Sequence, residues 1–352
     1  MEIQTLKDLP PVGELGFGRH YAPLMAISDY KDSKWGPVKL GPLKTLDVHP
    51  GARCLHYAQE IFEGLKAYKN SKTGKVHLWR PNFNIRRMSR SAEIMIMPPF
   101  PEDVFLNSMR DLVAQSLKFV PDSPGALYLR PTCVGVSSSL GVAPAQEYSF
   151  YILASPVGGY FGGVKADEPS SIRLWVSPEK VRAAHGGVGS AKTGANYASS
   201  LPALSYAKSK GFENVLFLDA VDKKNIEELS GMNFFVVEDG ILKTSPLGDT
   251  ILQGCTRDTI LTLGSKLDIP TREEKLPIDR IAQGIRSGSV TEAFACGTGA
   301  SITAVGELNW KDEKLTIAGG KPGKFTRKLY TQLIGEQFGL LPPTDPSWIV
   351  PC

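Results

Sequence analysis

The sequence has few cysteines and histidines, and neither residue is arranged as a known metal site or disulfide framework. The five cysteines are odd in number, widely spaced and never arranged as CxxC, at Cys54, Cys133, Cys255, Cys296 and Cys352. This pattern indicates neither a disulfide framework nor a zinc ribbon. The five histidines show no HExxH or HxxxH spacing, which argues against a histidine metal site. We expect reduced thiols and no metal.

Long apolar runs and a strong net charge are also missing. No segment approaches the roughly 20 apolar residues that span a bilayer, and a net charge of +4 over 352 residues is too small to indicate nucleic acid as a partner. The first residues, MEIQTLKDLPP, lack the basic start and apolar run of a signal peptide. We therefore expect a cytoplasmic protein, and the small net charge leaves small anionic ligands open. Its length predicts two domains, since single cores stop growing at about 250 to 300 residues.

The first half of the chain predicts a hairpin, two helices and two buried strands. The hairpin covers residues 55–81, with the turn NSKTGK between its strands. The helices cover 82–95 and 101–120, and the second has an apolar face at helical spacing, formed by Phe105, Met109, Leu112, Val113 and Leu117. The strands are ALYLRPTCVG and YSFYILASPVG.

The second half alternates strands with helices and begins after a stretch rich in glycine. That stretch, GGYFGGVKADEPSS, predicts a domain boundary. We expect a small N-terminal α/β domain over residues 1–162, a linker over 163–170, and a larger C-terminal domain with a strand-rich core over 171–352. Predicted strands include IRLWV, NVLFLD and MNFFVVE, and predicted helices include 200–211 and 256–267.

The stretch GGVGSAKT, residues 186–193, raises two interpretations of Lys192. It nearly matches the P-loop pattern of ATPases, and VLFLD at 215–219 is similar to a strand that ends in a magnesium-binding Asp. However, Ala191 stands where the second P-loop glycine is needed, and no apolar strand runs into Gly186. The other interpretation is a reactive lysine, because its neighbours are small and leave room for a flat ring.

Several separate motifs favour the reactive lysine through a resemblance to one family. SAKTGANYA, EELSGMNFF, ILQGCTRDTI and ACGTGASIT follow each other in the order and spacing of the branched-chain amino-acid aminotransferases, which are fold type IV pyridoxal-phosphate enzymes. LHYAQEIFEGLKAYK, LWRPNFNIRRMSRSA, LYLRP and SPVGGYF resemble the blocks of the same family in the first half. The resemblance covers residues 15–340. It implies a two-domain α/β (α+β) fold of type IV and reversible transfer of the amino group of Leu, Ile or Val to 2-oxoglutarate.

The resemblance implies that pyridoxal 5'-phosphate is the cofactor and gives two residues central roles. Lys192 would bind the cofactor covalently and then move the proton between the substrate Cα and the cofactor. Glu228 would pair with the pyridine nitrogen and keep it protonated. The alternative interpretation of Glu228 is a carboxylate in a turn or helix cap.

The resemblance also implies the residues that hold the rest of the cofactor. Arg87, one of three arginines at Arg86, Arg87 and Arg90, matches the phosphate-binding arginine, although such a run is often a solvated helix face. Cys255 and Thr256 lie where a turn enters a predicted helix, so backbone N–H groups there could receive phosphate oxygens. Further matches are Thr298 for the phosphate, Tyr197 for the ring oxygen and Arg182 on the phosphate side.

Substrate binding requires an apolar pocket and polar groups for the α-carboxylate. By resemblance, Tyr57, Phe62, Tyr128 and Tyr160 surround that pocket, although core packing is the ordinary role of such aromatics. Backbone N–H groups of Gly299 and Ala300 would receive the α-carboxylate. Arg130 would receive the side-chain carboxylate of glutamate.

Some residues depart from the family pattern, at Gln253, Cys255 and Gly299, and the cysteine pair of some animal members is replaced by Ala300 and Thr303. Other fold type IV activities, D-amino-acid aminotransferase or aminodeoxychorismate lyase, and a P-loop ATPase more distantly, remain as alternatives. The family is dimeric, so we expect a homodimer or higher homo-oligomer. The small residues around 136–146 are the predicted contact with a second chain.

Overall fold

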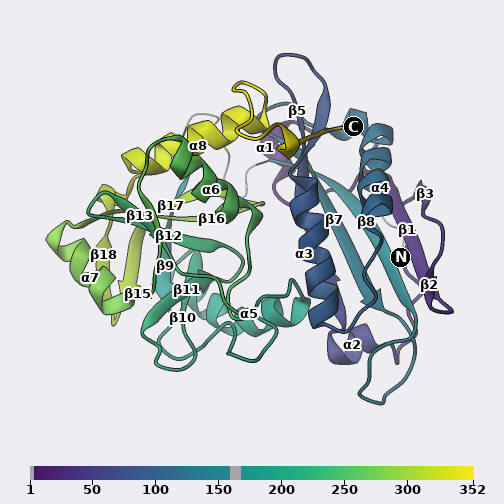
Figure 1. Ribbon diagram of the computed structural model, residues 1–352, viewed down its shortest axis with the longest axis horizontal. Coiled ribbons are helices and arrows are strands. Elements are labelled where there is room, and N and C mark those ends of the chain that lie inside the picture. The colour runs from purple at the N-terminus through teal and green to yellow at the C-terminus, as the bar shows by residue number, and fades with distance from the viewer. Residues whose placement is uncertain (1–3, 159–167) are drawn as a thin grey trace. The chain divides into compact units, whose positions relative to one another are not determined.

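A computed structural model describes residues 4–158 and 168–352 (Figure 1). The chain divides into two compact units, each with its own sheet. The first unit is Met1–Val164, Ala191–Gly194 and Glu336–Cys352, and the second is Lys165–Ser190 and Ala195–Gly335. Among the described residues, no helix is long and apolar enough to span a bilayer.

The first unit is built on a sheet whose described strand pairs are all antiparallel. The main path runs β19-β6-β5-β7-β8-β1-β2, with β3 beside β1 and β4 beside β7. Its strands are β1 (Leu24–Lys31), β2 (Lys34–Trp35), β3 (Lys39–Pro42), β4 (Glu60–Phe62), β5 (Leu65–Lys69), β6 (Val76–Trp79), β7 (Ala126–Gly135), β8 (Tyr148–Val157) and β19 (Ile349–Pro351). The predicted hairpin is confirmed only for β5 and β6, because residues 55–57 end α2 (Arg53–Tyr57) and β4 pairs with β7. The two predicted buried strands are confirmed as β7 and β8.

The helices of this unit include α1 (Val12–Leu15), α2 (Arg53–Tyr57), α3 (Pro81–Ile94) and α4 (Glu102–Gln115), and its 3₁₀ helices include η1 (Leu117–Phe119) and η3 (Pro346–Trp348). The two predicted helices are confirmed as α3 and α4. Proline at the first position suits the start of α3, and Glu102 and Asp103 in the first turn of α4 favour its N-terminus. The prediction that Leu117 joins the apolar face of α4 is wrong: α4 ends before it, and its side chain is 51% exposed.

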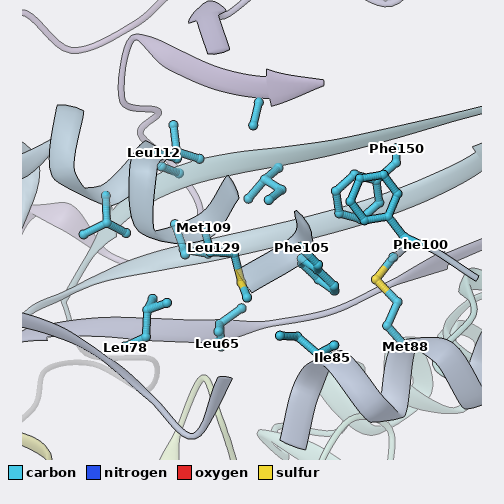
Figure 2. Close-up of a cluster of buried hydrophobic side chains, with 14 of the residues drawn as sticks. Leu65, Leu78, Ile85, Met88, Phe100, Phe105, Met109, Leu112, Leu129 and Phe150 are labelled. Carbon is cyan, nitrogen blue, oxygen red and sulfur yellow. The ribbon is translucent and has the colours of Figure 1, made fainter. Parts of the chain in front are cut away.

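The core of the first unit lies between these helices and the sheet (Figure 2). Phe105 from α4 meets the ring of Phe150 from β8 edge-on at 5.0 Å, and Phe100 stacks on Phe150 at 3.9 Å. Figure 2 shows Ile85 and Met88 of α3 entering the same cluster. The apolar stripes of α3 and α4 therefore belong to the core.

The second unit contains a mixed sheet that closes on itself. The main path runs β14-β13-β12-β16-β17-β9-β10-β11-β15, with β18 beside β17. Because β11 also pairs with β12 through Glu228 and Asn233, the strands β12, β16, β17, β9, β10 and β11 form a ring. The strands are β9 (Ser171–Val176), β10 (Asn214–Leu218), β11 (Asn225–Leu229), β12 (Asn233–Glu238), β13 (Ile241–Thr244), β14 (Thr271–Glu273), β15 (Leu276–Pro277), β16 (Val290–Gly297), β17 (Ser301–Trp310) and β18 (Glu313–Thr316).

The helices of the second unit include α5 (Gly194–Ser209), α6 (Cys255–Lys266), α7 (Ile278–Ser287) and α8 (Lys324–Gln337), and the first and last of these extend into the first unit. Between β17 and α8 lies the 3₁₀ helix η2 (Ala318–Gly320). Ala203 and Ala207 of α5 pack on Val215 and Phe217 of β10. The predicted helix at 256–267 is confirmed as α6, and the one at 200–211 is the second part of α5.

Two segments belong to a different unit from the one expected for them. The sequence placed all residues after 171 in the C-terminal domain, but β19 pairs with β6, so the C-terminal residues belong to the first unit. The second segment is Ala191–Gly194, which is part of the first unit although the chain before and after it is part of the second. Most of the predicted linker, residues 163–167, lies outside the described residues.

Candidate active site

Lys192 lies in an irregular segment immediately before α5. A P-loop requires a strand that runs into its first glycine, but β9 ends at Val176 and turns and bends occupy the residues between it and Gly186. Asp219, the supposed magnesium ligand, accepts backbone N–H groups of Asp222 at 2.8 Å and Asn225 at 2.6 Å. The P-loop interpretation is therefore wrong.

The amine of Lys192 lies among side chains of the first unit. Its Nζ is 4.6 Å from the centre of the Phe62 ring. Burial, together with the positive charge of Arg87 and against the effect of Glu63, lowers the pKa of Lys192 to about 8. An ordinary lysine has a pKa of about 10.4, so this amine is far more often neutral near pH 8. A neutral amine is the nucleophilic form.

Arg87, the predicted phosphate ligand, forms a buried ion pair in the structure. Its Nε and Nη2 lie 2.7 Å from the two carboxylate oxygens of Glu63, a two-point contact. Glu63 is fully buried and also accepts hydrogen bonds from Asn84 at 2.7 Å and from the backbone N–H of Gly64 at 3.1 Å. The sequence analysis did not single out Glu63, although it lies within the FEG block that supported the resemblance. Phosphate binding by Arg87 stays a prediction.

Three of the predicted substrate residues come together beside Lys192. The guanidinium carbon of Arg130 lies 4.6 Å from the centre of the Phe62 ring, and its Nη2 donates to Tyr128 Oη at 2.9 Å. A Cβ at Gly64 would overlap Tyr128 Oη, so only glycine fits there. The structure thus forms an aromatic and cationic wall from β4 and β7.

Lys66 and Tyr57 are further residues of the first unit, and Lys66 adjoins this wall. Lys66, which the sequence analysis missed, pairs across the strands with Tyr128, and burial lowers its pKa to about 8. Tyr57 closes α2, and its hydroxyl donates to the carbonyl of Leu140. Tyr160 lies outside the described residues.

Glu228 is held at the point where the ring of strands closes in the second unit. Its carboxylate is 2.8 Å from Nη2 of Arg182, and it accepts hydrogen bonds from the N–H of Leu252 and from Nδ2 of Asn233, both at 3.0 Å. Arg182 also donates to the carbonyls of Gly189 and Thr250. Arg182 therefore contacts Glu228, and its predicted place on the phosphate side remains untested.

The predicted phosphate turn leads into α6. Cys255 and Thr256 occupy its first turn, and the cap residue Gly254 supplies no side-chain cap. A Cβ at Gly254 would overlap Oδ1 of Asn233, so this turn packs closely against a residue that binds Glu228. Backbone N–H groups and the helix dipole at such an N-terminus favour an anion.

The remaining predicted residues lie nearby in the same unit. Thr298, Gly299 and Ala300 form the turn between β16 and β17. That turn follows Cys296, which pairs with Asn233 across β16 and β12. Tyr197 lies in the first turn of α5, and a Cβ at Gly231 would stand 3.5 Å from its ring.

The chain is similar in sequence and in fold to known proteins. The chain is 40% identical over 335 residues to branched-chain-amino-acid transaminase 1 of Bacillus subtilis, covering 95% of this chain and 93% of the relative. The crystal structure of the Escherichia coli branched-chain amino acid aminotransferase superposes with a TM-score of 0.77 at 27% identity, covering 92% of this chain and 98% of that one. The branched-chain amino acid aminotransferase of Thermobaculum terrenum, in its PLP-form, shares the fold at 23% identity and a TM-score of 0.73, covering 93% and 97%. The amino-transferase class IV model matches residues 60–308, and the chain belongs to that family.

Proposed function

We propose that the protein is a branched-chain amino-acid aminotransferase that uses pyridoxal 5'-phosphate. It transfers the amino group of Leu, Ile or Val reversibly to 2-oxoglutarate. The observation that carries the proposal is the lowered pKa of the Lys192 amine beside the Phe62, Tyr128 and Arg130 wall, in a chain of the class IV family.

The residues present fit this cofactor. An aldehyde carbon needs a neutral amine, which the lowered pKa of Lys192 supplies. A pyridine nitrogen that must keep its proton needs a buried carboxylate, and Glu228 is 3% exposed and held by three donors. A phosphate needs N–H donors, which the first turn of α6 presents around Cys255 and Thr256. The buried Oγ1 of Thr193 has no hydrogen-bond partner among the described residues, which leaves it able to bind a ligand.

Different residues of the chain have different roles in the proposed reaction. Bound pyridoxal phosphate supplies an electron sink for the pair released when the Cα proton leaves. Nζ of Lys192 would take that proton from the substrate Cα and return it to the cofactor. Glu228 would accept a hydrogen bond from the ring nitrogen, and Arg182 holds the Glu228 carboxylate in place. Phe62 covers Nζ with an apolar surface that excludes water.

Two substrates of different polarity are accommodated by one wall. The ring of Phe62 suits a branched aliphatic side chain, and Arg130 pairs with the side-chain carboxylate of glutamate. Arg130 donates to Tyr128 in the structure, so its guanidinium is placed before any carboxylate arrives. Gly299 and Ala300 offer backbone N–H groups to the α-carboxylate. We also propose that residues 163–170 link two domains, because the two units part between Val164 and Lys165.

We further propose that two copies of the chain associate. Leu140 and Val142, in the loop predicted for this contact, are 70% and 86% exposed on the described chain. Exposed apolar residues of this size favour a contact surface. A cytoplasmic location remains a prediction that fits the five cysteines, all of which are free thiols.

The test is a borohydride reduction of the purified holoenzyme followed by peptide mass spectrometry, together with amino-group transfer assays. We expect the cofactor mass on Lys192, transfer from leucine to 2-oxoglutarate, and no transfer in Lys192→Ala, because the covalent bond and the proton carrier are lost together. A label on another lysine would contradict the assignment. Transfer from D-alanine but not from leucine would favour D-amino-acid aminotransferase instead.

A further inference from the structure

We propose that Glu60 and Ser91 are positioning residues that hold the backbone of Lys192–Gly194 from two sides. The proposal rests on the proposed function of Lys192. It goes beyond that function because it gives a positioning role to residues that do not touch the reacting atoms. It follows from the hydrogen bonds of residues 192–194.

Lys192 is bonded through both of its backbone groups to the first unit. Its N–H donates to Oγ of Ser91 at 3.0 Å, and its carbonyl accepts from the N–H of Phe62 at 2.9 Å. Ser91 is 1% exposed and lies on α3, four residues after Arg87. Residues four apart share one face of a helix, so the helix that presents Arg87 to Glu63 also presents a hydroxyl to Lys192.

Glu60 completes the arrangement two residues further along. Its carboxylate accepts the backbone N–H of Gly194, the first residue of α5. A Cβ at Gly194 would overlap this carboxylate, so glycine is needed for the contact. A carboxylate at a helix N-terminus is also favoured by the helix dipole. Glu60 belongs to β4, the strand that also supplies the N–H of Phe62.

These bonds explain why Ala191–Gly194 belongs to the first unit while the chain on either side belongs to the second. The groups that lower or raise the pKa of Lys192, namely Arg87, Glu63, Tyr128 and Arg130, are all in the first unit. The amine therefore keeps its surroundings only while its backbone stays bonded to β4 and α3. Released from them, Lys192 would lose both its burial and its alignment.

The test compares Ser91→Ala, Glu60→Ala and Glu60→Gln in the holoenzyme. We expect amide hydrogen exchange in residues 189–196 to rise about tenfold in Ser91→Ala and Glu60→Ala, since each loses one acceptor. We expect kcat to fall about tenfold or more, with KM for leucine within about twofold, because alignment and not binding is lost. Glu60→Gln keeps an acceptor oxygen and should stay within about threefold of the wild type in both measurements.

The matched control is Ser108→Ala. Ser108 is a buried helical serine whose hydroxyl donates to the carbonyl of Val104 in its own helix, and its replacement should leave exchange at 189–196 unchanged. Unchanged exchange in both alanine variants would overturn the proposal. The same rise in exchange and fall in kcat in Glu60→Gln and Glu60→Ala would also overturn it. That result would mean that the negative charge facing Arg130 matters and the acceptor oxygen does not. Borohydride labelling of a different lysine would instead refute the proposed function, and the two failures are thus distinguishable.

Discussion

At the residue scale, two effects lower the pKa of the Lys192 amine. Burial disfavours the ammonium form, and Arg87 adds a like charge nearby. Glu63 works in the opposite direction, but its carboxylate is bonded at two points to Arg87. The Arg87–Glu63 pair therefore affects the pKa of Lys192 in two opposite directions.

We predict that Arg87→Gln raises the pKa of Lys192. The change removes a positive charge that lowers this pKa and leaves Glu63, which raises it, without its cation, so both effects have the same sign. Less neutral amine is therefore present at pH 8. The measurement is the pH dependence of lysine labelling at Lys192 by mass spectrometry after the cofactor is removed.

The control for this prediction is Arg86→Gln, since Arg86 is exposed on the same helix. It should leave the labelling midpoint of the wild-type protein near pH 8. A wild-type midpoint near 10 would contradict the lowered pKa itself.

At the element scale, α4 shows how the end of a helix decides burial. The sequence periodicity continues through Leu117, but the helix ends at Gln115 and η1 turns the chain. Phe105, Met109, Leu112 and Val113 are buried, while Leu117 is not. Hydrophobic periodicity predicts a face correctly only as far as the helix extends.

We predict that Phe105→Ala destabilises the protein by about 3–5 kcal/mol, because it leaves a cavity beside Phe100 and Phe150. Leu117→Ala removes a largely exposed side chain and should cost less than about 0.5 kcal/mol. Denaturant unfolding monitored by fluorescence measures both. Equal losses of unfolding free energy in Phe105→Ala and Leu117→Ala would mean that Phe105 is not part of the core.

At the scale of the whole molecule, the chain enters the first unit three times. Its N-terminal part forms most of the sheet, Ala191–Gly194 joins it before α5, and the last residues return as β19. Lys192 thus belongs to the first unit and Glu228 to the second.

The proposed association of two chains makes a prediction at this scale. The double change Leu140→Glu and Val142→Glu should shift the protein toward monomers and lower its activity, because charge replaces exposed apolar surface in the proposed contact. Sedimentation velocity at micromolar concentration measures the shift. Val221→Glu, at an exposed residue of the second unit, is the control and should leave the assembly unchanged. A fully active monomeric wild type would contradict the proposal.

The sequence alone determined those elements and candidate site residues that depend on local chemistry and on the spacing of nearby residues. It predicted α4 from apolar periodicity and β7 and β8 from apolar runs, and it led to Lys192 and Glu228 because each lies in a continuous block that resembles one family. Small residues around a lysine and a carboxylate before a turn are local signals, so no contact between distant segments was needed to find them.

Only the tertiary structure decided which residues far away in the sequence contact Glu228 and the segment that carries Lys192. Ser91 and Glu60 lie about 100 and 130 residues before Lys192 and Gly194, and a buried serine or a glutamate in a strand carries no sequence signal of its own. The pairing of Glu63 with Arg87, the contact of Arg182 with Glu228 and the return of β19 to β6 likewise depend on sheet register and helix packing. These are properties of the folded chain, because hydrogen bonds between segments far apart in sequence form only once the sheets have brought them together.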